Sequence, residues 1–387
     1  MSSKYDRVKI KVHLGGEHYY ILSRFLLSKM LTFCKLPTTA AARVSLALKK
    51  FFVDQEKLEI TQAELETATF CTMAQYGYGE AHARLFPLMT RFYIERVPLV
   101  ILIAGSGCCG KTAIAHSLSS KLNTHNVVST DVLLDILTAI HNNFPTASTT
   151  GDGEFDFGRT WPQPDERALW LRETETEEEF ICLWRAWAEA LHPLVVEELQ
   201  KALTEGKVLL VEGSLLNLAL YREYLLPEFQ RRHGAIVVAF HVTSDEASRQ
   251  FTVERFVSAR LAMLPSTHRN DDAVAVEWVM RRLKAIEAEQ LQTLASRGGG
   301  MRLCRIDERW DGSFTPNPHD ACSFNGELSV DSSACVSPGV GPPDSAAEEM
   351  LPVYLVTYSV ETAARPQEVM QELLLERIRA ELHQRHS

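Results

Sequence analysis

The chain has 387 residues, enough for two or more domains, and 45% of them are hydrophobic, as in an ordinary globular protein. Its formal net charge of −10 argues against a general nucleic-acid binder, which needs a basic face. No apolar run approaches the roughly 20 residues of a membrane-spanning helix, and no secretory signal opens the chain. We therefore expect a cytoplasmic protein without a membrane partner, either monomeric or oligomeric.

Residues 1–95 have the pattern of a small, mostly helical domain. The stretch 8–12 alternates like a half-buried strand, and 19–21 returns after a Gly-Gly turn. Apolar spacing then predicts helices over 23–34, 39–53 and 81–93. Thr61 and Glu64 form the T-x-x-E pattern that caps the start of one more helix.

The most informative stretch of the chain is PLVILIAGSGCCGKT, over 98–112. An unbroken apolar run over 100–104 predicts a strand buried on both faces, and 113–122 predicts a helix. The residues between them fit G-x-x-x-x-G-K-[ST] without mismatch, and this order of elements argues against a chance glycine-rich turn. Such a loop cradles phosphates, because glycines allow close approach and the loop N–H groups face the anion.

The phosphate loop supplies candidate ligands for ATP and Mg²⁺. We expect Lys111 to reach the β- and γ-phosphates and the Thr112 hydroxyl to ligate Mg²⁺. Two cysteines lie inside the loop, where positive surroundings favour a reactive thiolate, whereas burial against the sheet makes a cysteine an inert hydrophobe. The candidate nucleotide-binding residues are Gly105, Ser106, Gly107, Cys108, Cys109, Gly110, Lys111 and Thr112. The eight cysteines of the chain show no C-x-x-C spacing, so reduced thiols are expected instead of a zinc site or disulfides.

Two acidic residues follow apolar stretches further along the chain. The stretch 127–131 predicts a second strand with Asp131 at its carboxyl end, where ligands bind in parallel sheets. The stretch 207–213 predicts a third strand that ends in Glu212, a Walker B pattern whose carboxylate holds Mg²⁺ directly or through water. The candidate metal ligands are therefore Thr112, Glu212 and Asp131.

The remaining elements complete an alternating order of strands and helices. A fourth strand is predicted over 235–242 and a fifth over 301–306, with a long helix over 180–205 and another over 274–294. The helix over 245–262 carries Arg249, Arg255 and Arg260. Solvated surface is the ordinary interpretation of such a helix, but its place after the fourth strand favours contact of at least one arginine with phosphate.

Composition divides the chain into four parts. Residues 1–95 form the helical domain, 96–310 the phosphate-loop domain, 311–349 a Gly-, Pro- and Ser-rich linker, and 350–387 a strand and helix that must dock elsewhere. A further loop is predicted over 142–164, and the acidic run over 173–179 indicates a solvated helix start. The expected fold is α/β, a doubly wound parallel sheet of the P-loop type with a helical N-terminal domain.

The N-terminal part, over about 6–93, resembles the ATP-cone, a regulatory nucleotide-binding module of ribonucleotide reductases and a few kinases. The resemblance rests on the hairpin-then-helix order and on phrases such as ILSRFLLSKM, over 21–30. It implies a second ATP site, with a helical docking domain that binds no ligand as the alternative.

A wider resemblance covers about 6–310. The motifs GSGCCGKT, STD over 129–131, VEG over 211–213 and ERFVSAR over 254–260 together resemble the 2-phosphoglycerate kinase family and the plant P-loop proteins linked to low phytic acid. This resemblance implies transfer of the ATP γ-phosphoryl group to a hydroxyl of a small acid or polyol that already carries phosphate. Catalysis would consist of positioning and charge neutralisation.

The resemblance assigns roles to the candidate catalytic residues Lys111, Asp131, Arg255 and Arg260. Asp131 would accept the hydroxyl proton or support the metal, and the two arginines would neutralise a transferred or substrate phosphate. Two other functions stay open. One is an ATP-binding regulatory or scaffold protein with weak ATPase activity, and the other is a polynucleotide 5′-hydroxyl kinase, which the acidic balance disfavours.

Overall fold

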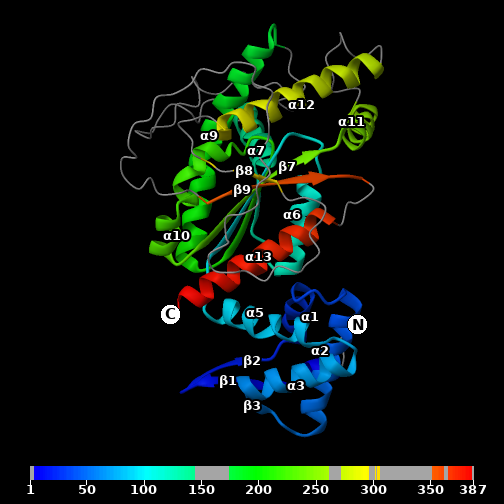
Figure 1. Cartoon of the computed structure of the whole chain (residues 1–387), viewed down its shortest axis with the longest axis vertical. Helices are drawn as coiled ribbons and strands as arrows, with labels where there is room; N and C mark the ends of the chain where they lie inside the picture. Colours follow the sequence, from blue (N-terminus) through cyan, green and yellow to red (C-terminus); the bar gives the residue numbers. More distant parts are fainter. Residues whose placement is uncertain are drawn as a thin grey trace, which may run out of the picture.

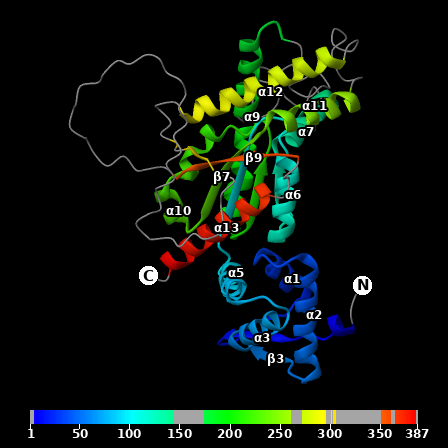
Figure 2. The same cartoon turned by 45° about the vertical axis from the view of Figure 1, so that its right-hand side comes forward.

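The computed structural model describes residues 4–143, 174–260, 272–295, 301, 303–305, 351–360 and 365–385. A small N-terminal part lies against one end of a larger part that is built on a parallel sheet (Figure 1 and Figure 2). The predicted linker over 311–349 lies outside the described residues, as does the predicted loop over 142–164 after its first two positions. No described helix is both long enough and apolar enough to cross a bilayer.

The N-terminal part contains the predicted hairpin, whose first strand begins three residues later than predicted, and the predicted helices, of which the one expected over 81–93 is divided into two, Glu80–Ala83 and Leu85–Ile94. Strands β1 (Lys11–Gly15) and β2 (His18–Ile21) pair antiparallel, and β3 (Glu59–Thr61), which the sequence analysis missed, pairs parallel with β1. The predicted capping box is confirmed, since Thr61 and Glu64 each accept the other's backbone N–H at the start of α3. The helical elements are η1 (Lys4–Arg7), α1 (Arg24–Phe33), α2 (Thr38–Asp54), α3 (Gln62–Gln75), α4 (Glu80–Ala83) and α5 (Leu85–Ile94).

The larger part is an α/β structure around a six-stranded sheet in which every neighbouring pair is parallel. Its order is β5-β6-β4-β7-β9-β8, so β9 lies between β7 and β8 although it follows both in the chain. The strands are β4 (Leu99–Ala104), β5 (Val127–Ser129), β6 (Val208–Glu212), β7 (Ile236–Ser244), β8 (Leu303–Arg305) and β9 (Val353–Tyr358). The predicted parallel α/β sheet is therefore present.

Helices cover both faces of this sheet. The central strand β4 is buried throughout, and alternate residues contribute to two different apolar clusters, as expected for a strand covered on both sides. Helices α6 (Lys111–Leu122) and α13 (Arg365–Gln384) lie on one face, and α9 (Glu177–Glu205) and η3 (Leu218–Leu225) on the other. The remaining helices are α7 (Thr130–Asn143), α10 (Pro227–His233), α11 (Glu246–Arg260) and α12 (Asp272–Ala295).

The C-terminal helix joins the two parts of the molecule. Helix α13 packs against α5 and α6, between the sheet and the N-terminal part (Figure 1). Gln371 donates to the Phe33 carbonyl at 2.7 Å, and Lys35 pairs with Glu372 at 2.6 Å. One apolar cluster runs from Phe33 through Leu374 to Ile101, so the N-terminal part and the sheet share a continuous core.

Candidate phosphate-transfer site

The loop between β4 and α6 has a backbone that requires glycine at its two ends. Gly105 has φ 140°, and a Cβ there would lie 2.2 Å from the Val242 carbonyl oxygen. Gly110 has φ 80°, and its Cβ would meet the Tyr358 ring of β9 at 2.8 Å. Cys108 has φ 59°, a left-handed conformation that costs a non-glycine residue about 1 kcal/mol or more. The loop is thus shaped by close backbone packing, and β9 forms part of its support.

Lys111 lies within the loop with its side chain almost fully buried. Its Nζ donates to the Ser106 carbonyl and lies 3.7 Å from Cys109 Sγ. Burial alone would lower the pKa of this ammonium, but the Cys109 sulfur and the carboxylates of Asp131 and Glu212 outweigh burial and raise it. The raised pKa keeps Lys111 protonated near neutral pH, so the loop carries a positive charge that suits the binding of phosphate.

The structure brings two predicted metal ligands together. Thr112 Oγ1 donates to Glu212 Oε2 at 3.1 Å, and Glu212 is 2% exposed at the end of β6. The described residues contain no cluster of three or more His, Cys, Asp or Glu that could enclose a metal. A hydroxyl and one carboxylate are nevertheless hard oxygen donors, and they fit Mg²⁺, which usually takes one or two carboxylates plus water and phosphate oxygens.

Asp131 lies in the first turn of α7, which begins at Thr130, instead of at the end of a strand as its sequence pattern predicts. Its carboxylate accepts the Ser214 backbone N–H at 3.0 Å and the Ser214 hydroxyl. The chain can approach this closely because Gly213 lacks a Cβ, which would lie 1.9 Å from Thr130 Oγ1. Ser214 is therefore a site residue that the sequence analysis missed.

Lys111, Thr112, Asp131 and Ser214 open onto one cavity of about 340 Å³. The lining comes from the phosphate loop, from the start of α7, from Ser214 after β6 and from Phe256 of α11. Gly105, Ser106 and Glu212 are not part of the lining and lie behind it. The lining residues are Gly107, Cys108, Cys109, Gly110, Lys111, Thr112, Ala113, Asp131, Val132, Leu134, Asp135, Ser214 and Phe256.

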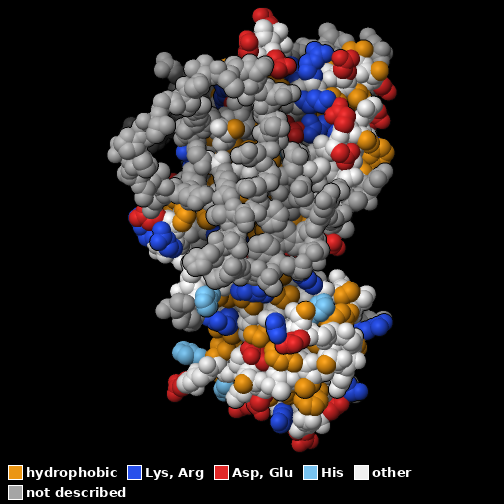
Figure 3. Space-filling view, in the orientation of Figure 1, with side chains coloured by type: hydrophobic (Ala, Val, Ile, Leu, Met, Phe, Trp, Pro, Cys, Tyr) orange, Lys and Arg blue, Asp and Glu red, His pale blue; other side chains and the backbone are white. Residues whose placement is uncertain are grey.

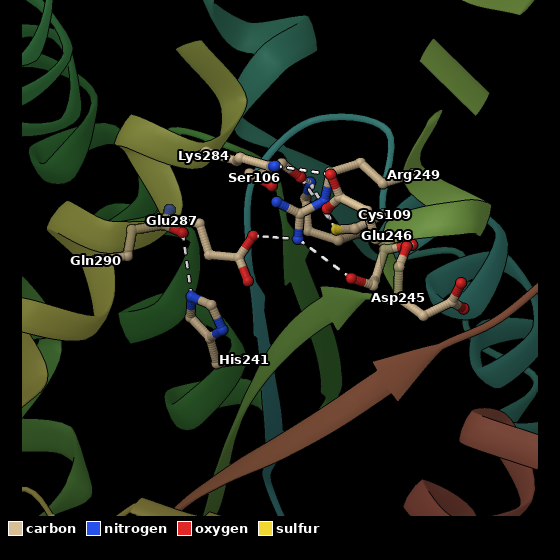
Figure 4. A network of polar contacts seen from close by, with 11 residues as sticks. Ser106, Cys109, His241, Asp245, Glu246, Arg249, Lys284, Glu287 and Gln290 are labelled. Atoms are coloured by element: carbon tan, nitrogen blue, oxygen red, sulfur yellow. Dashed lines mark hydrogen bonds and ion pairs between the residues drawn. The ribbon is translucent and has the colours of Figure 1, made fainter. Parts of the chain in front are cut away.

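The predicted arginines lie in different surroundings on α11. Arg255 is exposed, with its guanidinium 5.7 Å from the centre of the exposed Phe251 ring, and the Arg260 side chain lies outside the described residues. Arg249 is 5% exposed, forms an ion pair with Glu287 of α12 and donates to the Ser244 carbonyl at 3.3 Å (Figure 4). Arg249 is thus the α11 arginine buried beside the loop. Its position one turn after β7 is the signal that could have distinguished it.

A second cavity, of about 280 Å³, lies in the N-terminal part between the hairpin and helices α1, α3 and α5. Most of its lining is apolar, and Lys29 is the single Lys or Arg among the residues that line it. Acidic and basic side chains are mixed over the surface of this part in Figure 3. ATP binding here stays a prediction of the ATP-cone resemblance.

The two loop cysteines differ in burial, and this difference predicts different reactivity. Cys109 is 1% exposed and its Sγ donates to the Ser106 carbonyl, and burial raises the pKa of its thiol. Cys108 is partly exposed and lines the cavity. A thiol reagent should therefore inactivate the protein through Cys108, more slowly with MgATP present, and Cys108→Ser should resist while Cys109→Ser stays sensitive. Equal inactivation rates for wild type and Cys108→Ser would contradict this assignment.

The burial of His241 predicts that the stability of the protein depends on pH. It is fully buried on β7, and burial together with the Lys111 and Arg249 charges lowers its pKa from 6.5 to about 4. Between these values the unfolded chain binds a proton that the folded chain does not, so stability falls as pH falls. From about pH 7 to about pH 5 this histidine should remove about 2 kcal/mol from the free energy of unfolding.

Urea unfolding at the two pH values measures this effect. His241→Gln should lose about that much of the pH dependence, while His125→Gln, at an exposed position, should keep it. The same pH dependence in wild type and His241→Gln would show that His241 does not titrate as its burial requires.

The parallel sheet and the glycine-rich loop that joins β4 to α6 are consistent with a P-loop-like α/β fold. No family model matches the chain. Curated proteins named 2-phosphoglycerate kinase are similar to it. The one from Pyrococcus horikoshii is 20% identical over 277 residues, which are 70% of this chain and 84% of that protein.

Two further relatives with the same name have similar identity over shorter stretches. The Pyrococcus furiosus protein is 24% identical over 193 residues, which are 49% of this chain and 59% of that protein. A Methanococcus maripaludis protein is 22% identical over 258 residues, which are 63% of this chain and 74% of that protein. These similarities support a kinase-like function for this chain.

Proposed function

We propose that this protein is an ATP-dependent kinase that transfers the γ-phosphoryl group to a hydroxyl of a small acid or polyol already carrying phosphate, with 2-phosphoglycerate as the first candidate acceptor. The observation that carries the proposal is the convergence of Lys111, Thr112 and Asp131 on one cavity, with Glu212 hydrogen-bonded to Thr112. The names of the relatives point to the same class of reaction.

Each residue would then perform one task. The loop N–H groups and Lys111 bind the β- and γ-phosphates, and Lys111 leaves the Ser106 carbonyl to do so. Thr112 and Glu212 would hold Mg²⁺, which neutralises phosphate charge when bound. Asp131 orients the acceptor hydroxyl and takes its proton as the oxygen bonds to the γ-phosphorus. The bond from that phosphorus to the bridging oxygen of ADP breaks in the same transfer.

The arginines of α11 remain proposed phosphate ligands. If Arg255 and Arg260 contact phosphate in the loaded enzyme, Arg→Lys at either position should lower kcat several-fold, because a point charge does not replace a planar fork. Arg281→Lys is the matched control, since Arg281 is exposed on α12 and pairs with Glu277 one turn away. Unchanged kcat in both α11 variants would show that this helix face is solvated surface.

A panel of acceptors tests the proposed function. The purified chain is incubated with γ-labelled ATP and phospho-acids, inositol phosphates, nucleosides or oligonucleotides, and label in each acceptor is counted. We expect label in a phospho-acid, with 2-phosphoglycerate first. Label in an oligonucleotide would favour the polynucleotide kinase, and release of inorganic phosphate at a rate independent of every acceptor would favour the weak ATPase.

A further inference from the structure

The loop after β6 accepts hydrogen bonds from two buried side chains that have no role in the proposed chemistry. Trp184 of α9 donates its indole Nε1–H to the Ser214 carbonyl at 2.9 Å. Gln290 of α12 donates its Nε2–H to the same oxygen at 3.1 Å. Trp184 is fully buried and Gln290 is 2% exposed, so neither donor has water as a ready alternative partner. One carbonyl oxygen therefore uses both of its lone pairs on fixed side chains.

Ser214 connects this support to Asp131. Its N–H and its hydroxyl donate to the Asp131 carboxylate, while its carbonyl accepts from Trp184 and Gln290. All the hydrogen-bonding groups of this 3% exposed residue are thus occupied, which leaves the loop little freedom to move. Ser214 therefore links the Asp131 carboxylate of α7 to the helices α9 and α12 through a chain of hydrogen bonds.

Gln290 also connects this support to the strand next to the phosphate loop. Because its Nε2 donates to a carbonyl, its Oε1 must accept, and His241 Nε2 lies 3.1 Å from that oxygen (Figure 4). This assigns the proton of neutral His241 to Nε2. His241 is paired in register with Ala104, the last residue of β4 before the phosphate loop. Gln290 therefore links His241, on the strand beside the phosphate loop, to Ser214, which contacts Asp131.

Helix α12, which carries Gln290, is itself fixed to its neighbours by ion pairs. Glu287 pairs with the buried Arg249, and Lys284 bonds to Glu246 at 2.7 Å, both on α11 (Figure 4). Glu289 takes two hydrogen bonds from Arg185 of α9, at 2.7 and 2.8 Å. These contacts fix α12, and with it the Gln290 side chain, against α9 and α11.

We propose that Gln290 and Trp184 are positioning residues that act through Ser214 to align the Asp131 carboxylate with the phosphate loop. The proposal rests on the proposed function in one respect, which is that Asp131 acts in phosphoryl transfer. A displacement of about 1 Å in a catalytic group can cost about 10²-fold in rate, so loss of either donor should act on the transfer step. ATP binding, which belongs to the loop and Lys111, should change little.

The test compares Trp184→Phe and Gln290→Met with Trp187→Phe. Gln290→Met keeps side-chain size, whereas Trp184→Phe makes the buried side chain smaller, as Trp187→Phe also does, and each test substitution removes one donor from the Ser214 carbonyl. Trp187 is also buried on α9, and the donors to the Ser214 carbonyl are Trp184 and Gln290, so Trp187→Phe is a matched control for the loss of indole volume. Hydrogen exchange of the 213–217 amides is measured beside kcat and KM for ATP.

We expect kcat to fall about 10-fold to 100-fold in both test variants, with KM for ATP within about twofold of wild type. Exchange of the Ser214 amide should accelerate in both, and Trp187→Phe should change neither quantity. Gln290→Met leaves the His241 N–H without its acceptor and can therefore impair folding. Trp184→Phe leaves the bond between His241 and Gln290 intact, so the test is decided by this variant.

Two results would overturn the positioning role. One is wild-type kcat and wild-type exchange in Trp184→Phe, and the other is equal losses in Trp184→Phe and Trp187→Phe. The proposed function is tested separately by the wild-type protein, because an absence of acceptor-dependent transfer in wild type is a failure of that function alone. The exchange rates of the 213–217 amides test the hydrogen bonds from Trp184 and Gln290 to Ser214 whether or not the wild-type protein transfers phosphate.

Discussion

Lys111→Ala is expected to remove phosphoryl transfer almost completely while the protein stays folded. The ammonium lies inside the phosphate loop, its pKa is raised, and nothing but the Ser106 carbonyl and the Cys109 sulfur lies within bonding distance in the described residues. It is therefore available to the negative charge that develops during transfer. Removal of one such preorganised donor costs on the order of 10²–10³-fold in kcat, and loss of a full charge should cost at least that.

Steady-state kinetics measure the loss of phosphoryl transfer, and thermal unfolding checks that the variant stays folded. The matched control is Lys121→Ala at the other end of α6, where Lys121 Nζ donates to Gln371 at 2.7 Å. That variant should keep most of its activity, since its contact lies between α6 and α13. Wild-type turnover in Lys111→Ala would exclude the phosphate loop as the site of transfer.

Asp131→Asn is expected to abolish transfer and leave ATP binding largely intact. The substitution keeps size and an oxygen that can accept the Ser214 N–H, but it removes the charge and the capacity to take a proton. A general base contributes about 10²–10⁴-fold, so kcat should fall within that range while the dissociation constant for ATP changes by less than about threefold.

Asp135→Asn is the comparison variant, because Asp135 lines the same cavity one turn further along α7. Its effect on kcat should be smaller than that of Asp131→Asn. If Asp131→Asn transferred phosphate at the wild-type rate, Asp131 would be only a first-turn acid that stabilises α7, an effect of about 0.3–1 kcal/mol on helix stability.

Sequence reasoning located the parts of this site that are encoded locally. The strand–loop–helix order around Gly105 and Lys111, and the apolar strand that ends in Glu212, depend on neighbouring residues in the chain. The Thr61–Glu64 capping box is of the same kind, since it forms within one helical turn. Such patterns carry their own physical reason, and they appear in the structure where they were predicted.

The parts that were missed depend on contacts between distant segments. Ser214, Trp184 and Gln290 carry no local pattern, because a serine after a strand and a glutamine or tryptophan on an amphipathic helix are ordinary residues. Only the packing of α9 and α12 beside the loop after β6 makes them partners. Strand β3 is likewise only three residues long and is defined by its pairing with β1.

The position of Asp131 shows why a local pattern can mislead. The apolar pair at 127–128 indicates a strand, but Ser, Thr and Asp are also typical of helix starts, and α7 begins at Thr130. The prediction that Asp131 faces the ligand end of the sheet was still useful, because β5 ends just before it and the carboxylate lines the cavity.

The central claim is that the loop of Lys111 and the carboxylate of Asp131 serve one transfer reaction, and the fate of the γ-phosphate tests it most directly. The measurement follows ADP and labelled phosphate together, with γ-labelled ATP and 2-phosphoglycerate, for wild type. We predict that ADP forms only when acceptor is present and that each ADP is matched by one labelled phosphate on the acceptor. ADP formation at the same rate without acceptor, with all label released as inorganic phosphate, would contradict the claim.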